Sequence, residues 1–210
     1  YNHFFISGIL TFILYIIFYK IKESQRLYTL ITILLVFNFS IFNIYLLSTG
    51  TFNYKIHLPL HLCYLTELGI LISIIFKTQY LYSWLILNSL GGGITGFTNS
   101  NLPEESMFIE YVHLYLSHFN LLLFTIIAYR IKFTISKVSF LKSTLFNLVI
   151  FITIFCFNLF VGSNYWFTNR KPMGLNLTLI FPDWPYYLLG LIMIGLISYY
   201  LTFRLFSRFK

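Results

Sequence analysis

Seven apolar segments follow one another along this chain of 210 residues, and their lengths limit the fold more than any other feature. They are 4–19, 27–47, 58–76, 80–98, 107–128, 144–163 and 184–206. A transmembrane helix needs about 20 apolar residues, with a usual range of about 17 to 25. Only 10% of the residues are charged, whereas a soluble globular protein carries about 25%. The sequence therefore predicts an all-α fold, a polytopic membrane helical bundle of about seven transmembrane helices in a single integral membrane domain, 1–210.

Lysine and arginine are distributed unequally between the two sides of such a bundle. Cytoplasmic connections of membrane proteins are enriched in these residues. One side holds eleven of them: Lys20, Lys22, Arg26, Lys77, Arg130, Lys132, Lys137, Lys142, Arg204, Arg208 and Lys210. The opposite side holds Lys55, Arg170 and Lys171. This bias predicts that the N-terminus lies outside and the C-terminus inside, and it accounts for the net charge of +8 without a nucleic-acid partner.

The amino-acid composition also bears on the source of the chain. Ile, Phe, Tyr, Asn and Lys are abundant, which is typical of an AT-rich bacterial genome. We therefore expect a multi-pass protein of a bacterial cell membrane. The two cysteines have neither the number nor the spacing of a disulfide framework or of a zinc site.

The stretch 58–67 places a thiol, an imidazole and a carboxylate in one apolar segment. Ionisable groups inside a membrane are costly, and they are candidates for function. Cys63 and Glu67 are four residues apart, so they share one helical face. His61 lies about 200° from Cys63 around a helix axis, so we expect it to face elsewhere. We interpret Cys63 as a nucleophile and Glu67 either as a carboxylate that orients an imidazole or as a neutral acid that joins two helices.

His118, in the segment 107–128, is the candidate base for Cys63. Asn101 can cap this helix and Pro103 suits a first turn, so we expect the helix to begin near Pro103. At about 1.5 Å per residue, His118 lies roughly 7–12 Å and Cys63 roughly 7 Å below the outer surface. A thiol reacts as its thiolate and therefore needs a base or a positive neighbour. The alternative is a buried polar network that only packs the helices.

Other ionisable residues are weaker candidates. We interpret Cys156 as a small buried hydrophobic residue, His113 as an interfacial residue, and His3 and His57 as residues in water. A metal site could be built from His61, Glu67, His113 and His118. No two of these four residues are histidines at the i, i+4 spacing typical of metal ligands on a helix, so we expect no metal, and we expect no cofactor.

Two segments have both a structural and a functional interpretation. The segment 80–98 contains four glycines, which either permit close helix packing or break the helix beside a polar cavity. The connection 164–183 is rich in Trp and Tyr, which favour the membrane interface. It either anchors the protein there or forms a lid on which Arg170 and Lys171 hold a lipid phosphate.

Several motifs resemble those of a known family. They are Leu58-Pro59-Leu60-His61-Leu62-Cys63, Leu116-Ser117-His118, Asn164-Tyr165-Trp166, Arg170-Lys171-Pro172 and Pro182-Asp183-Trp184-Pro185-Tyr186-Tyr187. Together they are similar to the YwaF-like bacterial membrane proteins, which are related to the vertebrate transmembrane phospholipid transacylases and, more remotely, to the androgen-induced membrane hydrolases. The resemblance implies a helical membrane fold and, through the vertebrate relatives, a catalytic Cys63 and His118. The family's Gly-Pro-Trp-Pro pattern is replaced here by a loop that contains Asp183, to which no role is carried over.

These observations favour a membrane-embedded acyltransferase that acts on phospholipid or lipoprotein acyl groups through a thioester on Cys63. The residues expected to bind substrate are His61, Glu67, Asn88, Ser117, Arg170 and Lys171. Asn88, Ser117 and the backbone near Gly92 are the candidate oxyanion donors. The expected partners are membrane lipids of the outer leaflet and, as an acyl acceptor, a lysolipid or a lipoprotein.

Two alternatives belong to other classes of protein. One is a substrate-binding membrane subunit of a small-molecule transporter, and the other is a non-catalytic membrane protein whose polar groups pack helices. A thiol-directed lipid electrophile distinguishes them from an enzyme. If the protein is an enzyme, this reagent should label Cys63, and the labelling should be lost when His118 is changed.

Overall fold

The computed structural model describes residues 3–103, 105–174 and 176–208. Within these ranges the chain forms helices and no strands, in agreement with the predicted all-α class. The elements are α1 (His3–Lys20), α2 (Ser24–Ser48), α3 (Leu62–Ile75), α4 (Tyr82–Thr98), α5 (Phe108–Arg130), α6 (Lys137–Val161), the 3-10 turns η1 (Tyr165–Phe167) and η2 (Leu177–Ile180), and α7 (Tyr186–Phe206). Each α-helix overlaps one of the seven predicted apolar segments.

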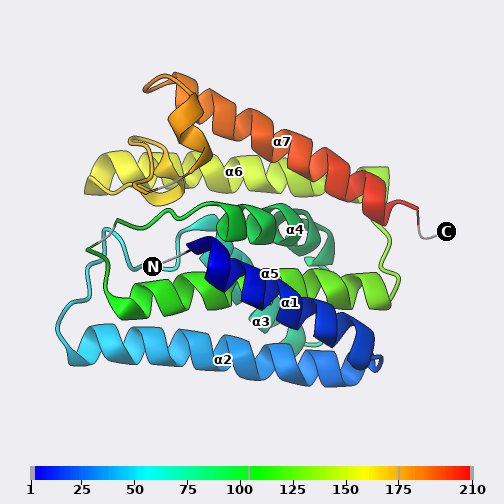
Figure 1. Cartoon of the computed structure of the whole chain (residues 1–210). Helices are drawn as coiled ribbons and strands as arrows, with labels where there is room; N and C mark the ends of the chain where they lie inside the picture. Colours follow the sequence, from blue (N-terminus) through cyan, green and yellow to red (C-terminus); the bar gives the residue numbers. More distant parts are fainter. Residues whose placement is uncertain (1–2, 104, 175, 209–210) are drawn as a thin grey trace.

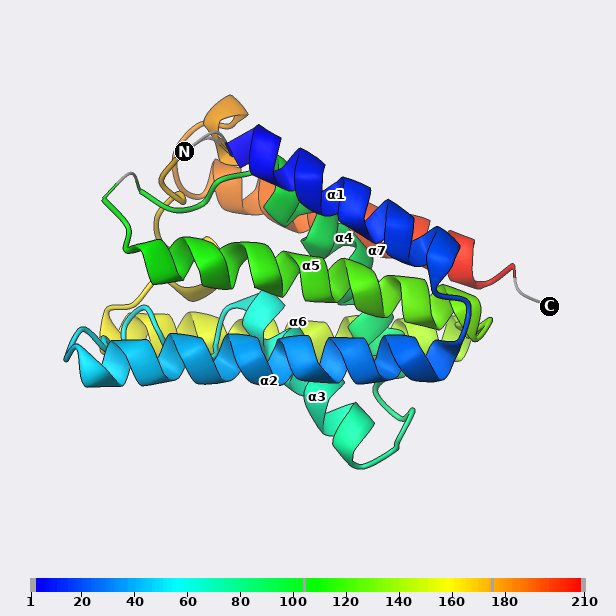
Figure 2. The same cartoon turned by 60° about the horizontal axis from the view of Figure 1, so that its bottom comes forward.

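The helices α4 and α5 form the centre of the bundle. Figure 1 shows α2 on one side of α5, with α6 and α7 on the opposite side of α4. The helix α4 packs against α1, α3, α5, α6 and α7. Figure 2 shows the same arrangement from another side, with α5 between α1 and α2. A helix rich in glycine and polar residues is therefore enclosed by apolar helices, of which α1, α5, α6 and α7 are longer than α4.

The outer helices expose apolar side chains, as helices in a bilayer do. Phe12 of α1, Ile44 of α2, Phe160 of α6 and Leu201 of α7 are all more than half exposed. Five helices within the described residues (α1, α2, α5, α6 and α7) are long and apolar enough to cross a membrane. The chain is thus a multi-pass membrane protein, although α3 and α4 are shorter than the predicted spans. The number of spans and their orientation remain predictions.

The structure corrects two predicted helix starts. The helix α3 begins at Leu62, because the backbone of His61 before it is extended (φ −65°, ψ 144°) and not helical. The helix α5 begins at Phe108 and not near Pro103, so Asn101 is not its cap. Instead, the Glu110 carboxylate accepts a hydrogen bond of 2.8 Å from the backbone N–H of Met107, which satisfies one donor of the first turn.

The glycines of α4 favour helix packing over a helix break. The helix is continuous from Tyr82 to Thr98. A Cβ atom at Gly93 would lie 2.5 Å from the Leu122 side chain of α5. The two central helices therefore approach each other closely only because side chains are absent on this face of α4.

The ends of the helices suggest a test of the predicted orientation. Figure 1 shows the connections after α2, α4 and α6 at one end of the bundle and those after α1, α3 and α5 at the other. We expect a reporter inserted at Asn169 to lie outside and one fused after Arg208 to lie in the cytoplasm. Accessibility of each reporter to an impermeant reagent in intact cells measures this. Two reporters on the same side would contradict the alternating arrangement.

Candidate functional site

The connection between α6 and α7 fixes the start of α3. The Tyr165 hydroxyl accepts a hydrogen bond of 3.0 Å from the Leu58 N–H and donates one of 2.7 Å to the Tyr54 carbonyl. Burial raises the pKa of Tyr165 to about 12, so this hydroxyl keeps its proton at neutral pH. The Trp166 indole donates to the Leu60 carbonyl at 2.7 Å. The aromatic connection therefore holds the segment that leads into Cys63, a role that the predicted interfacial belt did not include.

A cavity of about 580 Å³ lies between this connection and the helices α3 to α7. This volume is within the range of about 300–1,000 Å³ that is usual for small-molecule sites. Its wall is mostly apolar. The polar side chains on its lining include His61, Cys63, Thr66, Asn88, Thr95, Asn99, Asn101, His118, Thr144, Asn147, Asn176, Ser198 and Tyr199. The structure thus brings Cys63 and His118, 55 positions apart in the sequence, to one cavity.

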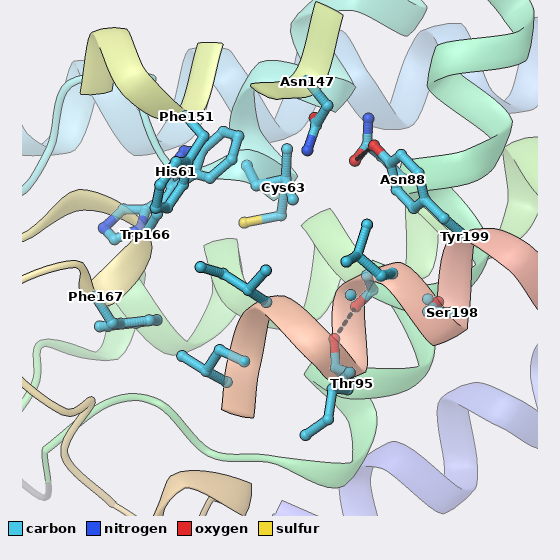
Figure 3. A pocket seen from close by; sticks show the side chains of 18 of the residues that line it. His61, Cys63, Asn88, Thr95, Asn147, Phe151, Trp166, Phe167, Ser198 and Tyr199 are labelled. Atoms are coloured by element: carbon cyan, nitrogen blue, oxygen red, sulfur yellow. Dashed lines mark hydrogen bonds between the residues drawn. The ribbon is translucent and has the colours of Figure 1, made fainter. Parts of the chain in front are cut away.

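Cys63 is the second residue of α3. Figure 3 shows its sulfur atom directed into the cavity, towards the side of His61 and Trp166. The first N–H groups of a helix have no acceptor within the helix, and the helix dipole is positive at that end. These N–H groups therefore favour negative charge on an oxygen atom bound beside the sulfur.

His118 packs its ring directly against the backbone of Gly96. A Cβ atom at Gly96 would lie 2.0 Å from Cγ and 2.1 Å from Nδ1 of the imidazole. Nδ1 is buried and has no hydrogen-bond partner among the described residues. Within the described residues no hydrogen bond joins His118 to Cys63, and such contacts often shorten only in the Michaelis complex.

Glu67 does not line the cavity, although the predicted helical face placed it with Cys63. Its carboxylate accepts hydrogen bonds from Ser117 at 2.6 Å, from Asn120 at 2.8 Å and from Asn38 at 3.3 Å. These partners come from α2 and α5, so the carboxylate joins three helices. Ser117 is likewise absent from the lining, because its hydroxyl is bound to Glu67.

His113 is the imidazole that this network orients. Its Nδ1 atom lies 3.1 Å from Oδ1 of Asn38, and its ring stacks on Phe42. His113 is therefore a paired member of this network, and its interfacial depth stays a prediction. Glu67 reaches His113 through Asn38 and makes no described contact with His118.

His61 and Asn88 both line the cavity. The prediction that His61 faces away from Cys63 is wrong, because His61 precedes α3 and does not follow its helical spacing. Its ring lies 5.0 Å from that of Tyr165. The Asn88 amide nitrogen donates to the Trp84 carbonyl at 3.0 Å, and its oxygen accepts from the Tyr199 hydroxyl. Asn88 thus connects α4 with α7 and has already used one amide donor.

Arg170 and Lys171 do not line the cavity. The Lys171 ammonium lies 3.0 Å from the Asp183 carboxylate and donates to the Phe181 carbonyl at 2.8 Å. Arg170 is exposed to solvent. The connection does cover the cavity, but with Trp166 and Phe167 in place of the two charged residues.

The comparisons with known proteins bear on this arrangement. A sequence model of the TMEM164 family matches residues 1–203. The chain belongs to the TMEM164 family. No curated protein and no solved structure matches it. Membership supports a multi-pass helical membrane protein, and the TMEM164-family match extends over both Cys63 and His118.

Three weaker interpretations are wrong for this TMEM164-family chain. His57 is 5% exposed, and its Nδ1 atom accepts a hydrogen bond from the Asn53 N–H. His3 bonds to the Tyr115 hydroxyl at 3.0 Å, so neither histidine is simply in water. Cys156 is exposed on α6 and is not buried. In the described part of the chain, no three His, Cys, Asp or Glu side chains are close enough together to hold a metal ion.

The sequence interpretation missed Asn147 of α6 and Tyr199 of α7, which both line the cavity. Figure 3 shows them on the side of the cavity that also carries Asn88. One signal was available for Asn147, since an amide in an otherwise apolar transmembrane segment is costly unless it is paired. No signal showed which face of α6 would be turned towards α4.

Proposed function

We propose that this protein is a membrane-embedded acyltransferase that uses Cys63 as nucleophile and His118 as base. The observation that supports it is the presence of both side chains on the wall of one largely apolar cavity. Cysteine and histidine within one cavity have the residue types needed for a thioester mechanism. The resemblance to YwaF-like proteins and to vertebrate phospholipid transacylases supports the same reaction.

The reaction has two balanced halves. The His118 imidazole takes the thiol proton, and the Cys63 thiolate attacks the carbonyl carbon of an acyl ester. The tetrahedral intermediate collapses, the lysolipid alkoxide leaves with the proton from His118, and the acyl group remains as a thioester on Cys63. The hydroxyl of a second lysolipid, or a lipoprotein amine, then gives its proton to His118 and attacks the thioester. Transfer of that proton back to Cys63 restores the enzyme.

The first turn of α3 offers the donors for the oxyanion. The N–H groups of Leu62, Cys63 and Tyr64 precede the first backbone hydrogen bond of the helix, which the Leu65 N–H donates to the His61 carbonyl. They lie beside the sulfur by covalent connection. Donors that are fixed in place before reaction stabilise a developing oxyanion without reorganisation. We propose these N–H groups as oxyanion donors in place of Ser117, because the Ser117 hydroxyl already donates to Glu67.

The lipid substrate would enter from the bilayer between α6 and α7. Both helices line the cavity, and both pack on α4 and only slightly on each other. In Figure 1 they diverge towards the end that carries their connection. With the predicted orientation, that end faces the outer leaflet. Arg170 stays a predicted contact for the phosphate at this rim.

The mass of the intact protein after incubation with phospholipid tests the proposal. We expect an acyl adduct, and digestion should place it on the peptide that contains Cys63 and not on the peptide that contains Cys156. Hydroxylamine should remove the adduct, because it cleaves thioesters. An unmodified protein after turnover conditions, or an adduct elsewhere, would contradict the mechanism and favour the transporter-subunit alternative.

A further inference from the structure

The orientation of one amide in the cavity is fixed by its neighbour. Nε1 of Trp84 donates a hydrogen bond of 3.1 Å to Oδ1 of Asn147. An indole N–H can only donate, so the oxygen of the amide must face Trp84. The nitrogen of the Asn147 amide therefore faces the other way. Figure 3 shows it directed into the cavity.

Most other donors on the cavity wall are already used within the protein. The amide nitrogen of Asn99 and the hydroxyl of Thr95 each donate to a backbone carbonyl of α4. The Thr144 hydroxyl donates to the Phe140 carbonyl within α6, and the Tyr199 hydroxyl donates to Asn88. The amide nitrogen of Asn147 has no hydrogen-bond partner among the described residues. The Asn147 side chain is only half-buried, so its amide nitrogen is accessible from the cavity.

We infer that Asn147 is a substrate-positioning residue, whose amide N–H donates to an ester carbonyl of the lipid in the cavity. This inference rests on the proposed function, because it assigns recognition of the acyl ester to the same cavity. In a wall that is mostly apolar, a fixed donor without a protein acceptor favours a ligand that carries an acceptor at that point. An acyl ester carries a carbonyl there, and an ether-linked chain carries a methylene group.

The selectivity between ester and ether lipids should therefore depend on Asn147. The test uses the Cys63→Ala variant, which cannot form the thioester, with an equimolar mixture of diacyl and dialkyl phosphatidylcholine of equal chain length. Native mass spectrometry separates the two complexes, because a carbonyl oxygen replaces two hydrogens in the ester. We expect the ester lipid to bind about 3- to 10-fold more tightly, as one net hydrogen bond gives. The ratio should fall close to one after the further change Asn147→Leu.

Two variants separate recognition from stability. Asn147→Leu leaves the Trp84 N–H without its acceptor, which can destabilise the protein. Trp84→Phe combined with Asn147→Leu removes both partners and should also give a ratio close to one. Thr153→Val is the matched control on the exposed face of α6, where the hydroxyl donates to Val149, and it should keep the parental ratio.

The outcomes distinguish this inference from the proposed function. An unchanged ester preference in both Asn147 variants, a ratio of one in the parent, or no binding of either lipid would overturn the role of Asn147. These measurements do not depend on acyl transfer. A Cys63 adduct without an Asn147-dependent ester preference would support the acyltransferase and overturn the role of Asn147. An Asn147-dependent ester preference without a Cys63 adduct would support a binding site for ester lipids and contradict the acyltransferase.

Discussion

Replacing Cys63 with alanine is expected to reduce acyl transfer by roughly 10³-fold or more, because no other thiol lies on the cavity wall. His118→Ala should cause a loss of similar size, since the thiol then has no base. The two losses should not add in the double variant, because both residues act in the same step. The measurement is transfer of a labelled acyl chain from phospholipid to lysophospholipid in detergent.

The control for this experiment is the second cysteine. Cys156 is exposed on α6 and does not line the cavity, so Cys156→Ala should retain activity. Thermal unfolding of each variant shows whether it is folded. Full activity in a folded Cys63→Ala protein would rule out the thioester mechanism. Loss of activity in Cys156→Ala alone would indicate that the nucleophile is Cys156, on the exposed side of α6.

Gly96→Ala is expected to give the second large effect. The new methyl group would lie 2.0 Å from the His118 ring, a distance at which either the imidazole or the whole of α4 must move. Overpacking of this kind costs about 1–3 kcal/mol of stability. A catalytic group displaced by about 1 Å can lose roughly 10²-fold in rate. We therefore expect activity per folded molecule to fall by about 10- to 100-fold.

Gly8→Ala is the matched control for this substitution. Gly8 is also a helical glycine, but a Cβ atom there meets nothing within 4 Å. It should leave both the unfolding temperature and acyl transfer close to those of the parent. If Gly96→Ala were as active as Gly8→Ala, the position of the His118 ring would not matter to the reaction. His118 would then be a packing residue.

The sequence predicted the seven helical segments, because long apolar runs in a chain with few charges can fold only as membrane helices. The predictions from the sequence were wrong where helical spacing was used to place residues that the helix geometry alone does not place. His61 was placed by helical angle from Cys63, yet it precedes the first turn of α3. Glu67 is on the same helix as Cys63, and a rotation of about 40° over four residues turns its carboxylate towards α2 and α5.

The polar partners could not be read from the sequence, because a side chain in an apolar segment is paired by whichever helix lies against it. His57 and His3 look like loop and terminal residues, and both are paired in the fold with groups far away in the sequence. Lys171 and Asp183 lie on one connection, yet only its folded path brings them to 3.0 Å. Residue depth and the resemblance to YwaF-like proteins suggested that Cys63 and His118 could meet.

The sequence by itself determined the class of protein, the order of its helices and the chemical groups available to it. Hydropathy acts along the chain, and the cost of leaving backbone groups unpaired in lipid leaves only helices for such segments. The tertiary structure alone decided which of those groups share a cavity. That choice depends on contacts between helices, such as the space that Gly96 leaves for His118 and the hydrogen bond that turns Asn147 towards the cavity. Neither contact has a periodic pattern in the chain, because each joins residues from different helices.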